Sequence, residues 1–75
     1  MKGVNVLPNI KISLAAARVN AGLSQDDVAR EMHVSKNTVV SWEKYKTEPS
    51  VSQGIKLSEL YNLPLDIINM RNDKG

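Results

Sequence analysis

The residue types that most often carry catalysis are scarce in this chain. Its 75 residues include one histidine, His33, and no cysteine. Three carboxylates, Asp26, Asp27 and Glu31, fall close together. Without a partner histidine or cysteine, or a glycine loop that can hold a phosphate, they form no recognisable active site or metal site. We therefore expect no enzymatic activity, no cofactor and no metal, and we interpret His33 as a turn residue.

The composition is that of one small globular domain. Hydrophobic residues make up 41% of the chain and charged residues 24%, and the formal net charge is +2. So weak a positive charge says little about a polyanionic partner. No segment has the apolar length of a signal peptide or of a membrane-spanning helix. We expect a soluble, cytoplasmic protein with a marginally stable core that association would support.

Serine, glycine and proline divide the chain into five predicted helical segments. Ser24 and Ser50 each stand three residues before a side chain that can complete a capping box, and Ser35 is a further N-cap candidate. Gly22 and Asn62 are candidates for the left-handed residues that end helices. The five segments cover about 10–21, 24–32, 35–44, 50–62 and 64–69.

These segments predict an all-α fold, a compact bundle of about five short helices. An N-terminal arm (1–8) precedes a single domain (9–70), and a frayed polar tail (71–75) follows it. In the fourth segment we expect three apolar side chains to face inward, namely Val51, Ile55 and Leu60.

The second and third segments are separated by only His33 and Val34. So short a connection does not suit a relaxed antiparallel hairpin. It favours two helices that cross steeply, which is the geometry of a helix-turn-helix.

The segment 24–44, SQDDVAREMHVSKNTVVSWEK, resembles the helix-turn-helix of the lambda-like repressors and Cro proteins (Cro/C1 type, XRE family). The resemblance extends to Arg18 and to segments 22–25, 49–50 and 63–68, and so covers nearly all of the chain after the arm. The places that this family fills with glutamine, alanine or apolar residues are occupied here by Gln25, Val28, Ala29, Met32, Val34, Val39 and Trp42.

This resemblance implies a lambda repressor-like bundle and a sequence-specific DNA-binding transcriptional regulator of the repressor type. The helix at about 35–44 would then enter the major groove of double-stranded DNA. Lysines there can donate to guanine, asparagine can pair with adenine, and valine can contact a thymine methyl group. The positions implied to contact bases are Ser35, Lys36, Asn37, Val40, Ser41 and Lys44.

The resemblance also implies contacts outside the base edges. Arg18 and Glu43 are expected to form a partly buried ion pair that orients the third helix. The side chains implied to contact phosphates are Gln25, Thr38, Lys46 and Lys11.

Two residues depart from the family pattern, which usually has glycine at both places. His33 stands in the turn, where a left-handed residue ends the second helix, and Tyr45 stands shortly after the third helix. A non-glycine residue in that conformation costs about 1 kcal/mol. We therefore expect either a different path for the loop 45–48 or an additional turn of the third helix.

Proteins of this kind usually bind an inverted-repeat operator as homodimers. The candidates for dimerisation are Ile67 and Met70, with help from the apolar residues of the arm. Two alternatives stay open. The same fold can serve as a helical protein-interaction module without DNA binding, or it can be the DNA-binding part of an antitoxin.

Overall fold

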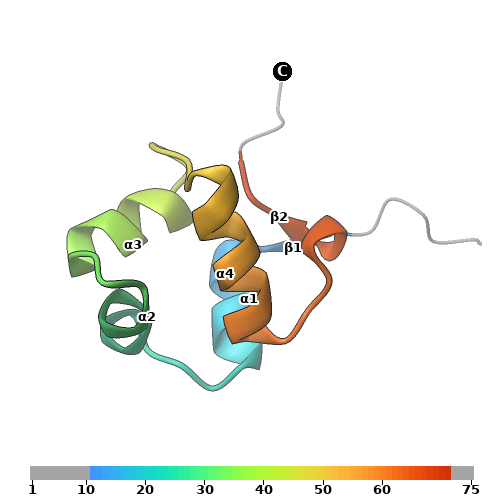
Figure 1. The fold of residues 1–75 in the computed structure, drawn as a ribbon, viewed down its shortest axis with the longest axis horizontal. Coiled ribbons are helices and arrows are strands. Elements are labelled where there is room, and N and C mark those ends of the chain that lie inside the picture. The colour runs from blue at the N-terminus through green and yellow to red at the C-terminus, as the bar shows by residue number, and fades with distance from the viewer. Residues whose placement is uncertain (1–10, 72–75) are drawn as a thin grey trace, which may run out of the picture.

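The computed structural model describes residues 11–71, so the predicted arm lies outside the described residues, as does the tail after Arg71. The elements follow the order β1 (Ile12–Ser13), α1 (Leu14–Asn20), α2 (Gln25–Met32), α3 (Lys36–Glu43), α4 (Val51–Tyr61), the 3-10 turn η1 (Leu65–Ile67) and β2 (Ile68–Asn69). In Figure 1, α1 and α4 occupy the centre, α2 and α3 lie to one side, and β1, β2 and η1 lie to the other.

One continuous hydrophobic core joins these elements. Each of the four α-helices contributes to it, and β2 adds one residue. Val39 and Trp42 of α3 are buried, as their helical spacing predicts. The buried hydrophobic residues that form the core are Leu14, Ala17, Val28, Ala29, Met32, Val39, Trp42, Leu57, Tyr61 and Ile68.

The prediction of a mostly helical bundle is confirmed, but the predicted number of five helices is not. Within residues 11–71 there are four α-helices, and the fifth predicted helix is the 3-10 turn η1 followed by β2. The first helix begins at Leu14 instead of residue 10, because the Ser13 side chain accepts a hydrogen bond from the Ala16 amide and caps it there.

The residues on either side of the helical core pair as a short parallel sheet. Ile12 lies opposite Ile68, and Ser13 lies opposite Asn69. β-branched isoleucine suits a pleated, half-buried strand. The two ends of the described chain are therefore joined by backbone pairing, which the helix signals did not predict.

The prediction that Val51 and Ile55 face inward is wrong. Val51 is 82% exposed and Ile55 is 44% exposed, whereas the buried stripe of α4 consists of Gly54, Leu57 and Tyr61. Leu57 and Tyr61 pack in the core, and Met70 lies over Gly54, where an added Cβ would be 3.7 Å from the Met70 sulfur. An exposed apolar surface is left at the start of α4.

Within residues 11–71, three residues other than glycine have left-handed backbones, with φ near +60° at His33, Tyr45 and Asn62. His33 and Asn62 end α2 and α4, as predicted, and their amides bond to carbonyls of the preceding turns. Tyr45 adopts the left-handed conformation that glycine adopts most readily. The loop 45–48 therefore needs neither a longer α3 nor a different turn.

The hydroxyl of Tyr45 accounts for the presence of tyrosine at this strained position. It accepts a hydrogen bond from the Leu14 amide at 3.1 Å and donates one to the Asn69 carbonyl at 2.8 Å. The side chain also packs against the core. The phenol thus links the first residue of α1, directly after β1, to the last residue of β2. These contacts offset the cost of the left-handed backbone.

We expect Tyr45→Phe to reduce the free energy of unfolding by about 1–3 kcal/mol, because two backbone groups lose their partner while the ring and the turn remain. Urea denaturation of both proteins measures the difference. Equal midpoints would show that the bridge does not stabilise the fold.

Burial raises the pKa of the Tyr61 hydroxyl to about 12, and the negative charge of Glu43 adds to the effect. In the unfolded chain a tyrosine titrates near pH 10. Between about pH 10 and pH 12 the unfolded chain therefore releases a proton that the folded protein retains, and stability falls as pH rises.

Tyr61→Phe removes this contribution, so its stability should fall less between about pH 8 and pH 11 than that of the wild type. Urea midpoints at the two pH values provide the measurement, and an identical fall in both proteins would contradict the assignment.

Candidate nucleic-acid interface

The helices α2 and α3 are joined by His33, Val34 and Ser35. The left-handed His33 ends α2, and the Val34 amide bonds back to the Ala29 carbonyl at 3.0 Å. In Figure 1, α2 is seen nearly along its axis while α3 lies across the view, so the two helices cross steeply. This is the crossing that the short connection predicts.

Local hydrogen bonds fix where each of these two helices begins. Ser24 and Asp27 form a full capping box on α2, with the Ser24 side chain bonded to the Asp27 amide at 2.9 Å and the Asp27 carboxylate bonded to the Ser24 amide at 2.8 Å. The bond from the Ser24 amide is the main reason that the pKa of Asp27 is lowered. At α3, the Ser35 side chain accepts from the Thr38 amide at 3.2 Å.

Most of the predicted base-contacting residues share one face of α3. Their i, i+4 spacing places them there, opposite the buried side chains of Val39 and Trp42. The lysines and the asparagine are exposed, whereas the valine and the serine are half-buried. The residues of this face are Lys36, Asn37, Val40, Ser41 and Lys44.

The two remaining polar residues at the start of α3 bond to each other. The side-chain oxygens of Ser35 and Thr38 lie 3.0 Å apart. Ser35, a predicted base contact, and Thr38, a predicted phosphate contact, thus support the first turn of α3 in this structure.

Arg18 and Glu43 form a bidentate ion pair between α1 and α3. Arg18 Nε lies 2.7 Å from Glu43 Oε2, and Arg18 Nη2 lies 3.3 Å from Glu43 Oε1. The side chains are only 16% and 7% exposed. The hydrogen bond to Glu43 is the main cause that raises the pKa of Arg18.

Two further groups join this pair, and the sequence did not reveal them. Arg18 Nη1 donates to the Leu23 carbonyl at 2.9 Å, and Gln25 Nε2 donates to Glu43 Oε1 at 3.0 Å. Gln25, predicted to contact a phosphate, is therefore held by Glu43. The side-chain nitrogen of glutamine carries two hydrogens, so the second hydrogen of Gln25 can be donated to another acceptor.

The predicted lysine contacts do not all lie together. Lys36 Nζ lies 3.8 Å from Asp26 Oδ2, an exposed pair that bridges α2 and α3. Lys46 is exposed in the loop after α3, where its amide bonds to the Ser41 carbonyl at 2.9 Å. Lys11 is also exposed, but it directly precedes β1, which Figure 1 shows well apart from α3.

Residues 11–71 contain no group of three or more histidine, cysteine, aspartate or glutamate side chains that could hold a metal ion. Over the same residues, none of the helices combines the length and the apolar character needed to cross a membrane.

We expect Glu43→Ala to reduce the free energy of unfolding by about 3 kcal/mol, because Arg18 and Gln25 are left without their acceptor in a largely buried place. The matched control is Lys36→Ala, which breaks an exposed pair and should cost less than about 1 kcal/mol. Urea unfolding measures both variants. Similar losses for the two variants would show that the pair between α1 and α3 has no special role.

Comparison with known proteins agrees with this arrangement. A family model described as Helix-turn-helix matches residues 14–68, which run from the first residue of α1 to the first residue of β2. An uncharacterized HTH-type transcriptional regulator of Methanocaldococcus jannaschii is 28% identical over 64 residues, or 85% of this chain and 97% of that protein. No solved structure matches the chain significantly. The match covers most of the chain, and the protein therefore belongs to the helix-turn-helix family, as its resemblance to Cro/C1-type repressors predicts.

Proposed function

We propose that the protein is a sequence-specific DNA-binding transcriptional regulator in which α2 and α3 form the helix-turn-helix. The observation that carries this proposal is the division of α3 between two environments. Val39 and Trp42 fix one face in the core, while lysine, asparagine and serine side chains line the other. The major groove of B-DNA admits a helix of this kind.

The exposed face of α3 offers the chemistry that distinguishes base pairs. Lys36 and Lys44 can donate to guanine O6 and N7, and Asn37 can form two hydrogen bonds with adenine. Val40 keeps part of its side chain accessible, which suits contact with a thymine methyl group. These contacts would determine which base sequence the protein binds.

Groups beside α3 would fix the domain on the phosphate backbone. Gln25 retains one amide hydrogen beyond its bond to Glu43, and Lys46 follows α3 in the next loop. Two carboxylates also stand at the start of α2. Their charge is balanced in place, since Asp27 pairs with Arg30 at 2.6 Å and Asp26 pairs with Lys36. These two carboxylates therefore repel a DNA phosphate less strongly than unpaired carboxylates would.

A single domain of this size that reads one major groove would bind weakly, so we extend the proposal to a homodimer on an inverted-repeat operator, acting as a repressor in the cytoplasm. In such complexes the half-sites lie about one helical turn apart. Residues 9–70 would form the domain in each copy. Ile67, which is 36% exposed, and Met70 remain the dimerisation residues expected from the sequence.

Selection of bound sequences from random duplex DNA, repeated at two salt concentrations, tests the function. Enrichment of an inverted repeat, with affinity that falls as salt rises, is the expected result. Absence of any enriched sequence would reject sequence-specific binding and favour a protein-interaction module.

Variants separate the two kinds of contact on the selected operator. Asn37→Ala should cost about 1–3 kcal/mol of discrimination at one base pair and relax the preference there. Lys46→Ala should weaken binding to all sequences alike and lower the salt slope by about 1. Lys56→Ala removes an exposed lysine of α4 and is the control, with no effect expected. Equal effects of Lys56→Ala and Lys46→Ala would indicate that charge alone determines binding.

A further inference from the structure

The loop that follows α3 is fixed to the last turn of that helix through its backbone. The Tyr45 amide donates to the Trp42 carbonyl at 3.0 Å, and the Lys46 amide donates to the Ser41 carbonyl at 2.9 Å. Between these two bonds the left-handed backbone of Tyr45, with φ of +59°, turns the chain away from α3. Lys46, a proposed phosphate contact, comes directly after this turn and is exposed.

The side chain of Tyr45 fixes the same turn to the terminal strands. Its hydroxyl bonds to the Leu14 amide and to the Asn69 carbonyl. Leu14 is the first residue of α1, and an amide at that position has no acceptor within its own helix. The hydroxyl therefore satisfies a group that needs a partner, and in doing so it holds the turn after α3 against the ends of β1 and β2.

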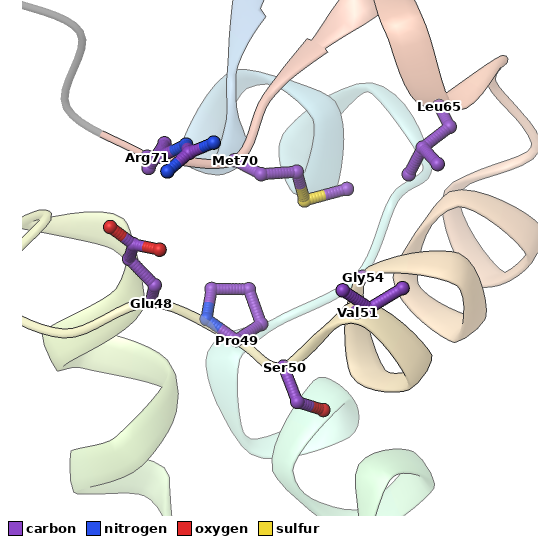
Figure 2. Close-up of a pocket in the computed structure, with 8 residues that line it drawn as sticks. All are labelled: Glu48, Pro49, Ser50, Val51, Gly54, Leu65, Met70 and Arg71. Carbon is purple, nitrogen blue, oxygen red and sulfur yellow. The ribbon is translucent and has the colours of Figure 1, made fainter.

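The loop packs less closely farther along the chain. A hollow of about 380 Å³ opens between the segment 48–50 and Met70, as Figure 2 shows. Pro49 borders it on one side and Met70 on the other, and they leave the space between them unfilled. The two hydrogen bonds of the Tyr45 hydroxyl are therefore a direct connection between this loop and the strands, made before the hollow begins.

The identity of the residue makes the turn dependent on these bonds. A side chain with a Cβ is sterically unfavourable in the left-handed conformation, whereas glycine adopts it readily. The hydroxyl contacts offset this cost at Tyr45. Without them the turn would be less populated, and Lys46 would take more positions in the free protein. A group that must be ordered on binding contributes less to affinity than one that is already in place.

We propose that Tyr45 is a positioning residue for DNA binding, whose hydroxyl holds the turn after α3 so that Lys46 meets the phosphate backbone. This inference rests on the proposed function and deepens it, because Tyr45 acts through Lys46. A hydrogen-bonded side chain at the terminal strands would thereby set the strength of a contact made beside α3.

A double-mutant cycle with affinity for the selected operator as its readout tests the proposal. Tyr45→Phe should weaken binding by about two- to tenfold and lower the salt slope toward that of Lys46→Ala. The loss caused by Lys46→Ala should be smaller in Tyr45→Phe than in the wild type, by about threefold or more. Each affinity is corrected for the folded fraction, which circular dichroism measures. A purely stabilising role of Tyr45 would then leave the two effects of Lys46→Ala equal.

The matched cycle combines Tyr45→Phe with Lys36→Ala, because Lys36 lies at the other end of α3. The effect of Lys36→Ala should agree within about twofold in the two backgrounds. Tyr61→Phe removes a tyrosine hydroxyl within the core and should leave operator affinity within about twofold of the wild type. Tyr45→Gly is the second variant, and it decides the matter if Tyr45→Phe does not fold. It removes the hydroxyl without the strained backbone, and the effect of Lys46→Ala should again be reduced.

Equal effects of Lys46→Ala in the wild type and in the folded Tyr45 variant would overturn the proposal. An equal reduction in the effect of Lys36→Ala would also overturn it, because the whole domain and not the turn would then have loosened. A wild type that binds no DNA would reject the proposed function and this inference together. A wild type that binds its operator, with additive effects of Tyr45 and Lys46, would reject the inference alone.

Discussion

The ion pair between Arg18 and Glu43 is the contact on which the arrangement of the helices depends. Its two hydrogen bonds join α1 to the end of α3, and the same two side chains also hold the Leu23 carbonyl and the Gln25 amide. One largely buried group of charges thereby links α1, the turn before α2, the first residue of α2 and the last residue of α3. Directional bonds of this kind specify angles between helices, which apolar packing alone does less well.

Around this contact the domain keeps structural and binding roles on separate faces. The side of α3 that carries Trp42 is buried, and the side that carries Asn37 is exposed. The residues that contact the core therefore differ from those proposed to contact bases. Exchange of an outward side chain should change which sequence is recognised while leaving the fold intact. Gln25 combines a structural role with a proposed binding role, because its side-chain amide bonds to Glu43 and it is also a proposed phosphate contact at the start of α2.

Local signals in the sequence predicted much of this domain. The caps at Ser24, Ser35 and Ser50 and the left-handed residues His33 and Asn62 depend only on near neighbours, and all of them occur as expected. The strands β1 and β2 were missed because each has two residues and exists only through its distant partner. The outward face of α4 was missed because helical spacing fits several apolar stripes. The stripe that is buried, which contains Leu57 and Tyr61, packs against residues from distant parts of the chain.

The Tyr45 bridge has a consequence for the order in which the chain folds. Its hydroxyl contacts residues 31 positions before it and 24 positions after it. Closing loops of that length costs more chain entropy than forming a local helical turn. The Leu14 amide and the Asn69 carbonyl can bond to this hydroxyl only after α3 has formed and the backbone at Tyr45 is left-handed. The terminal segments should thus join last in folding and separate first in unfolding, and the amides of β1 and β2 should exchange with solvent sooner than those of α2 and α3.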